Sequence, residues 1–170
     1  PVLSVVSYKF TFYLLYFRCK WVILRSATRK GAVKPMIKRE LYMSRIRPFI
    51  GSDLIKVMTG IRRCGKSVML ELVKQELTES GVHPSQFISI NFEDMRYSHL
   101  QTAKALHDEI TARAAEMEGK VYLFFDEIQE VKDWEKCVNS LRVSLDCDIY
   151  ITGSNAKLLS GELATYLGGR

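Results

Sequence analysis

Cysteine is scarce in this sequence, and long apolar runs are missing from its apolar first segment. The 170 residues include four cysteines, none of them in a C-x-x-C pair. A disulfide scaffold is therefore not expected. We expect a reducing, cytoplasmic compartment instead. In the apolar segment 1–24 the run Phe10–Phe17 has eight residues and none is longer, whereas a membrane-spanning helix needs about 20. The sequence therefore gives no clear indication of a membrane partner.

Acidic residues are absent from the first 35 positions. Residues 1–35 contain seven Lys or Arg and no Asp or Glu, whereas residues 36–170 contain 18 basic and 19 acidic side chains. The net charge of +6 and the pI of about 9.2 therefore come from this leader. Because the remainder is nearly neutral, the charge gives no clear indication of a nucleic-acid partner for the folded body. Nucleic-acid binding stays a third hypothesis that rests only on the basic leader.

Three interpretations of the leader remain open: an interfacial anchor, an extra strand or helix, or translation upstream of the true start. We favour the third, because Met36 opens a segment that is typical of a natural beginning. A signal peptide is not indicated, because its order of charges and its small-residue cleavage site are missing. The expected organisation is thus a leader, residues 1–35, followed by one domain over residues 36–170.

From residue 36 onward, short apolar runs alternate with helical patterns. The apolar runs predict strands over residues 54–59, 86–91, 121–125 and 148–152. Apolar residues at spacings of three and four predict helices over residues 40–50, 66–78, 100–118, 131–145 and 154–167. This alternation predicts an α/β fold of three layers, with a parallel sheet covered on both faces. Such sheets bind ligands beyond the carboxyl ends of their strands.

A glycine-rich loop follows the first of these strands. It reads Gly60-Ile61-Arg62-Arg63-Cys64-Gly65-Lys66-Ser67 and fits the whole Walker A pattern G-x-x-x-x-G-K-[ST]. Gly60 and Gly65 permit a tight loop whose backbone N–H groups surround a phosphate, and the following helix adds its positive N-terminal end. Lys66 would bind the β- and γ-phosphates, and Ser67 would bind Mg²⁺. We include Val68, the next residue, in the expected nucleotide site.

The variable positions of the loop have two interpretations each. Arg62 and Arg63 either contact phosphate or a partner subunit, or form a solvated basic rim, which we favour. Cys64 is either an oxidation-sensitive thiol beside the phosphate or a small residue that fits the loop, and we favour the second.

An acidic pair ends the third expected strand. Asp126 and Glu127 follow an apolar run, as in the Walker B arrangement. Asp126 would hold Mg²⁺, and Glu127 would orient and polarise the attacking water. The order of the two motifs, with adjacent Asp and Glu on a later strand, favours an ATPase. A GTPase would also need an N-K-x-D motif, which is absent.

The fourth expected strand ends in polar residues beside both motifs. Ser154 or Asn155 would lie between the phosphate loop and Asp126, where either side chain can sense the γ-phosphate. The alternative is that Ser154 caps the last helix. Both roles remain open.

Five segments carry a resemblance to a known family. They are GIRRCGKS, INFED (Ile90–Asp94), YLFFDEIQEVKDWE (Tyr122–Glu135), VNSLR (Val138–Arg142) and DIYITGSNAKLLSGELATYLGGR (Asp148–Arg170). Together they resemble a prokaryotic AAA+ ATPase family, in which this ATP-binding domain precedes a C-terminal domain of unknown function. The resemblance implies the AAA+ strand order, ATP and Mg²⁺ as ligands, and a cytoplasmic prokaryotic setting. It implies Ser154 or Asn155 as the first sensor, and Arg170 as an arginine finger presented to a neighbouring subunit of a homo-oligomer.

The chain departs from this family at its end. AAA+ domains continue into a fifth strand and a helical lid, whereas the sequence stops at Arg170, so it resembles an N-terminal fragment. The leading hypothesis is ATP binding with Mg²⁺-dependent hydrolysis, in which Lys66, Glu127, Asn155 and Arg170 are the catalytic residues. The alternative is a switch or interaction module that binds nucleotide without hydrolysing it.

Overall fold

A central parallel sheet organises the structure. A computed structural model of the chain describes residues 7–8, 39–61 and 63–154. Five strands form the sheet in the order β1-β2-β5-β4-β3, and every neighbouring pair is parallel. The strands are β1 (Ser7–Tyr8), β2 (Lys56–Gly60), β3 (Phe87–Asn91), β4 (Val121–Asp126) and β5 (Cys147–Ser154).

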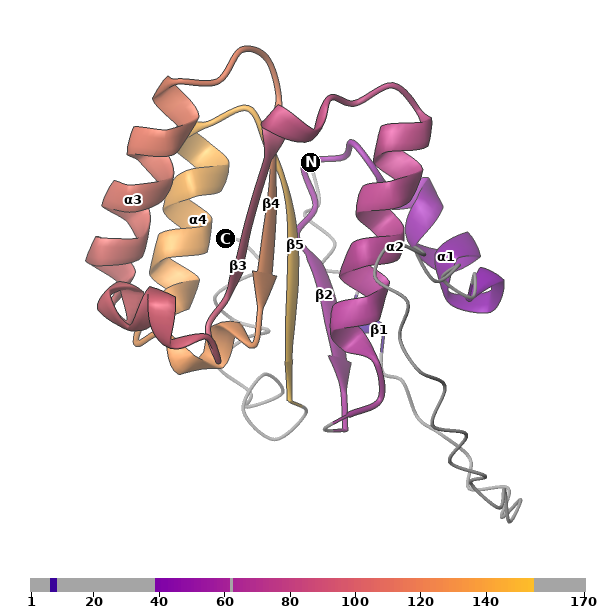
Figure 1. Cartoon of the computed structure of the whole chain (residues 1–170), viewed down its shortest axis with the longest axis horizontal. Coiled ribbons are helices and arrows are strands. Elements are labelled where there is room, and N and C mark those ends of the chain that lie inside the picture. The colour runs from indigo at the N-terminus through magenta and orange to yellow at the C-terminus, as the bar shows by residue number, and fades with distance from the viewer. Residues whose placement is uncertain (1–6, 9–38, 62, 155–170) are drawn as a thin grey trace, which may run out of the picture.

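Helices cover both faces of the sheet. Figure 1 shows α1 and α2 on one side of the strands and α3 and α4 on the other. The helices are α1 (Glu40–Ile46), α2 (Lys66–Glu79), α3 (Ala103–Ala115) and α4 (Trp134–Ser144). Short 3-10 turns join these elements at η1 (Arg47–Phe49), η2 (Pro84–Gln86), η3 (Met95–Leu100) and η4 (Ile128–Glu130). The three-layer α/β fold expected from the sequence is therefore confirmed.

Strands β2 and β5 are mostly apolar because both of their faces are buried, whereas the edge strand β3 exposes Ser89 and Asn91. All five residues of β2 are buried, and so are the first seven of β5. Alternate residues of β2 enter different cores: Val57 packs in the cluster that includes Leu106 and Leu141 of α3 and α4. Met58 packs instead with Val73 of α2 and its neighbours. This two-sided burial is what a parallel sheet between helical layers requires.

The expected helices and strands lie close to those observed, although several of their ends differ by up to four residues. The helix expected from residue 100 begins at Ala103, because the Thr102 hydroxyl accepts a hydrogen bond from the Ala105 N–H and caps it. The helix expected from residue 131 begins at Trp134, which is buried. Ser154 is the last residue of β5, paired in register with Gly60, so the helix expected from residue 154 does not begin there. Its alternative role as a helix cap stays a prediction. The rest of the helix expected over residues 154–167 lies outside the described residues.

The leader contributes one short element to the described structure. Ser7 and Tyr8 form β1, which pairs with Val57 and Met58 of β2 at one edge of the sheet. The other residues of the leader lie outside the described ranges, so the choice among its three interpretations stays a prediction.

A buried ionic network lies at the amino end of the sheet. The Lys56 ammonium on β2 pairs with the Asp148 carboxylate on β5, and both side chains are buried. The other carboxylate oxygen of Asp148 accepts hydrogen bonds from the Tyr150 hydroxyl and the Gly51 N–H, each at 2.8 Å. Burial lowers the pKa of Lys56, and the nearby Asp148 charge opposes that effect. The network joins the loop before β2 to the centre of the sheet.

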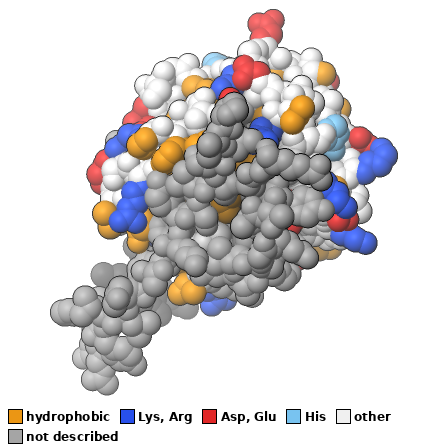
Figure 2. Space-filling model, turned by 180° about the vertical axis from the view of Figure 1, so that it is seen from behind, with side chains coloured by type: hydrophobic (Ala, Val, Ile, Leu, Met, Phe, Trp, Pro, Cys, Tyr) orange, Lys and Arg blue, Asp and Glu red, His pale blue; other side chains and the backbone are white. Residues whose placement is uncertain are grey.

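The visible surface has mixed charge. In the reverse view of Figure 2, Lys and Arg side chains alternate with Asp and Glu around the described part of the molecule. Among the described residues no helix is long and apolar enough to cross a membrane.

Candidate nucleotide-binding site

The glycine-rich loop joins the carboxyl end of β2 to the first turn of α2. Gly65 has a φ of 89°, a backbone conformation that glycine adopts without strain. At Gly60 an added Cβ would lie only 2.7 Å from the Cys64 Sγ, so a side chain here would force Cys64 to move. Lys66 follows as the first residue of α2 and is buried. The two pattern glycines thus let the chain fold back tightly at the positive end of a helix.

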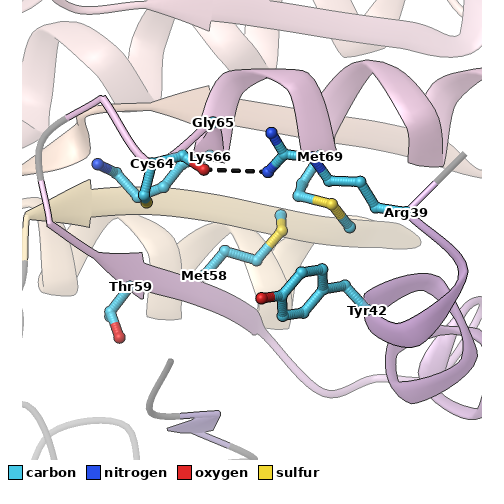
Figure 3. A pocket seen from close by; sticks show the side chains of 8 residues that line it. All are labelled: Arg39, Tyr42, Met58, Thr59, Cys64, Gly65, Lys66 and Met69. Carbon is cyan, nitrogen blue, oxygen red and sulfur yellow. Dashed lines mark hydrogen bonds between the residues drawn. The ribbon is translucent and has the colours of Figure 1, made fainter. Parts of the chain in front are cut away.

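Arg39, just before α1, holds this loop from the side. Its Nη1 donates a hydrogen bond to the carbonyl oxygen of Cys64 at 3.0 Å (Figure 3). The guanidinium also lies against Gly65, where an added Cβ would meet Nη2 at 2.5 Å. Below it, Tyr42 and Met58 line a cavity of about 20 Å³, which holds about one water molecule. The α1 segment therefore supports the outer side of the loop.

The cation of the loop meets the acid that follows β4. The Lys66 Nζ lies 3.1 Å from the Glu127 Oε1, and both side chains are largely buried. The other oxygen of this carboxylate, Oε2, accepts a hydrogen bond from the Gln129 amide at 2.6 Å. Glu127 has a φ of 55°, which is uncommon for a residue with a side chain and is found mostly where a site requires it. The carboxylate is thus held at the mouth of the loop by two partners.

Asp126 is oriented from the neighbouring strand. The Thr152 hydroxyl on β5 donates a hydrogen bond to the Asp126 Oδ1 and accepts one from the Glu127 N–H at 3.1 Å. Thr152 is fully buried and Asp126 is 6% exposed. One hydroxyl therefore fixes both acids of the pair relative to β5.

The residues present fit a magnesium ion. Ser67 and Asp126 line one cavity of about 250 Å³, together with Asn91 at the end of β3. Hydroxyl and carboxylate oxygens are the ligands that Mg²⁺ prefers, and this ion is usually completed by phosphate and water. Among the described residues no group of three or more His, Cys, Asp or Glu could form a cage for a metal. The donor set therefore suits a metal that arrives with a phosphate ligand.

The structure brings most of the residues singled out in the sequence to one edge of the sheet. Around the loop mouth lie Gly60, Cys64, Gly65, Lys66, Ser67, Asp126 and Glu127. Ser154 is half-buried and lies beside Gly60 in the strand pairing. The side chains of Ile61, Arg63 and Val68 are exposed. The predicted roles of Arg62, Asn155 and Arg170 fall outside the described residues.

Three residues that contact the site were not singled out in the sequence. Gln129 carries a weak signal, because it follows Glu127 by two positions. Thr152 is a polar residue in an apolar strand, which is a second signal. Arg39 carries none, because only the fold brings it to a loop 25 positions away.

A loop of this shape between a buried strand and a helix, facing acids from a neighbouring strand, belongs to the P-loop class of nucleotide-binding folds. Within that class the chain belongs to the AAA domain family, whose sequence profile matches residues 52–170. Membership of this family indicates nucleotide binding. The AAA assignment expected from the five sequence segments is thereby confirmed.

The similar proteins are prokaryotic. The chain is 44% identical over 137 residues to an uncharacterized protein of Haemophilus influenzae. The matched region is 81% of this chain and 34% of that protein. It is also 40% identical over 117 residues to the uncharacterized protein MJ1544 of Methanocaldococcus jannaschii. This matched region is 68% of this chain and 24% of that protein. The matches thus span about a third or less of these relatives. No solved structure matches the chain.

Proposed function

We propose that this domain binds ATP with Mg²⁺ and, in the longer protein, hydrolyses it. The observation that carries the proposal is the 3.1 Å ion pair between Lys66 and Glu127. It brings a phosphate-binding cation and a carboxylate suited to activate water to one point. ATP rather than GTP is supported by the order of the sequence motifs and by membership of the AAA domain family.

In the proposed reaction each residue acts on a stated atom. The N–H groups of the loop bind phosphate oxygens, and Lys66 exchanges its contact with Glu127 for the β- and γ-phosphates. The released carboxylate of Glu127 orients a water molecule and accepts its proton as the water oxygen bonds to the γ-phosphorus. The bond to the β–γ bridging oxygen breaks, which leaves ADP and phosphate. When bound, Mg²⁺ held near Ser67 and Asp126 would neutralise charge on the phosphates.

Two substitutions separate binding from hydrolysis. We expect Lys66→Ala to weaken equilibrium ATP binding, and Glu127→Gln to preserve binding while lowering the hydrolysis rate by about 10²-fold or more. Lys104→Ala, on the exposed surface of α3, is the control and should change neither quantity. An equal loss of binding in both site variants would contradict the assigned roles. Tight binding by the wild type with no more turnover than Glu127→Gln would favour the non-hydrolysing switch instead.

A partner subunit is proposed on the resemblance to AAA+ proteins. In this proposal Arg170 acts as an arginine finger in a homo-oligomer and stabilises charge on the phosphates of a neighbouring chain. Arg170→Ala should then lower turnover by up to about 10³–10⁵-fold and leave ATP binding unchanged. Turnover that is independent of protein concentration in the wild type and unchanged in the variant would refute it.

A cytoplasmic setting is part of the same proposal. The described cysteines Cys64, Cys137 and Cys147 are all free thiols. Free thiols fit a reducing compartment.

A further inference from the structure

A single buried hydroxyl contacts both acids of the site. The Thr152 side chain is fully buried near the carboxyl end of β5, one position beyond the pairing of Ile151 with Phe125 on β4. Its oxygen accepts the Glu127 N–H at 3.1 Å, and its hydrogen is donated to the Asp126 Oδ1. A hydroxyl has one hydrogen to donate, so these two contacts determine its orientation.

The hydrogen bond that Thr152 donates to Asp126 decides which carboxylate oxygen of Asp126 is available. An ionised carboxylate only accepts hydrogen bonds, and Thr152 occupies Oδ1. Among the described residues no side chain donates to the other oxygen, Oδ2. Asp126 also lines the cavity that contains Ser67. The hydroxyl therefore restrains the rotation of the carboxylate and leaves one oxygen for a ligand in that cavity.

The hydrogen bond that Thr152 accepts from the Glu127 N–H stabilises an unfavourable backbone conformation at Glu127. Glu127 has a φ of 55° and a ψ of 48°, a left-handed conformation that costs about 1–3 kcal/mol for a residue with a side chain. Its N–H is directed at Thr152 in this conformation. The same backbone turn aims the carboxylate at Lys66, at 3.1 Å. The hydroxyl thus supports the position of the second acid through its main chain.

From these contacts we propose that Thr152 is a positioning residue, which orients Asp126 for Mg²⁺ and holds Glu127 at the phosphate loop. The inference rests on the proposed binding of Mg²⁺ and ATP. Groups that orient a metal ligand from behind typically change metal affinity by about 10–100-fold when they are removed. In this proposal Thr152 acts through its contacts with the two acids and not by touching metal or nucleotide itself.

The test uses Thr152→Val, which keeps the shape and removes the hydroxyl, and Thr152→Ser, which keeps the hydroxyl. Binding of a fluorescent ATP analogue is measured against Mg²⁺ concentration and in EDTA. We expect Thr152→Val to raise the Mg²⁺ concentration for half-maximal binding by about 10–100-fold, with binding in EDTA unchanged. Thr152→Ser should stay within about threefold of the wild type, since it retains both hydrogen bonds.

A matched control comes from the adjacent strand. Thr59 on β2 is also fully buried, and its hydroxyl has no hydrogen-bond partner among the described residues. Its side chain points to the opposite side of β2 from Met58 (Figure 3). Thr59→Val makes the same chemical change and should leave the Mg²⁺ dependence unaltered. Thermal unfolding of each variant shows whether it is folded.

The outcomes are distinct. A folded Thr152→Val protein with the Mg²⁺ midpoint of the wild type overturns the inference, and so does a Thr152→Ser protein that behaves like Thr152→Val. If Thr152→Val does not fold, Thr152→Cys, whose thiol donates weakly, must show an intermediate midpoint or the inference falls. If the wild type binds the analogue but Thr152→Val is unaltered, only the role of Thr152 fails. If the wild type binds no analogue at any Mg²⁺ concentration, both proposals fail.

Discussion

At the scale of single residues, the site depends on backbone conformations that most side chains disfavour. Gly65 has a φ of 89°, and Glu127 has a φ of 55°. Gly65 adopts its conformation without strain because it has no Cβ. Glu127 is held in its conformation by contacts with Thr152, Lys66 and Gln129. These positions place the phosphate loop and its opposing acid within 3.1 Å of one another.

Gly65→Ala should separate backbone strain from the loss of the site. Gly81 is the matched control, because its φ of 97° is also positive but an added Cβ there meets nothing within 4 Å. Both substitutions should lower the free energy of unfolding by about 1–2 kcal/mol, measured by urea denaturation. Gly65→Ala alone should also weaken ATP binding, since its Cβ would displace the Arg39 guanidinium from the loop. Equal ATP affinity in the two variants would contradict this.

At the scale of elements, strands β2 and β5 are joined at both ends. Near their carboxyl ends Gly60 and Ser154 pair in register beside the phosphate loop. Near their amino ends Lys56 and Asp148 form the buried ion pair, and Lys56 also lies over the Tyr150 ring at 5.3 Å. A misplaced β5 would therefore disturb both the ionic network and Thr152.

Asp148→Asn should destabilise the fold strongly. It removes the charge that compensates Lys56 in a fully buried site, and breaking one partner of a buried pair costs about 3–5 kcal/mol. The midpoint of urea unfolding gives the change. Asp108→Asn removes one partner of the exposed pair with Lys104 and should cost less than about 1 kcal/mol. A similar small cost for both would show that the network does not stabilise the sheet.

The order and type of these elements could be read from the sequence, but not their contacts. Apolar runs and helical spacing located four strands, because burial on both faces of a parallel sheet leaves an unbroken apolar run. The 3-10 turn Met95–Leu100 was missed, because it has no such period. Lys56 and Asp148, 92 positions apart, carry no local signal of their pairing.

At the scale of the whole molecule, two buried thiols report on the integrity of the core. Cys137 on α4 and Cys147 on β5 belong to the core between the sheet and helices α3 and α4. Burial, the largest cause, raises the pKa of Cys137 to about 12 and that of Cys147 to about 11. In the unfolded chain both thiols return to the ordinary value, so they ionise there first.

Alkaline pH should therefore destabilise the folded protein. Because the folded pKa values are raised, the stability is fully present below about pH 9 and is lost as the pH rises through about 11 to 12. Each thiol contributes a slope of up to about 1.4 kcal/mol per pH unit in that window. Urea unfolding at a series of pH values measures it. The Cys137→Ala and Cys147→Ala double variant should show a shallower decline, and an unchanged slope would refute the assignment.

The sequence by itself determined the α/β class, the phosphate loop and the acidic pair, because each is a local pattern of apolar runs, glycines or neighbouring charges. Only the tertiary structure decided that Lys66 and Glu127 lie 3.1 Å apart, that Arg39 supports the loop, and that Thr152 joins the two acids. The physical reason is that parallel pairing brings the carboxyl ends of distant strands to one edge of the sheet. A contact of this kind depends on strand order and register, which no single stretch of sequence encodes.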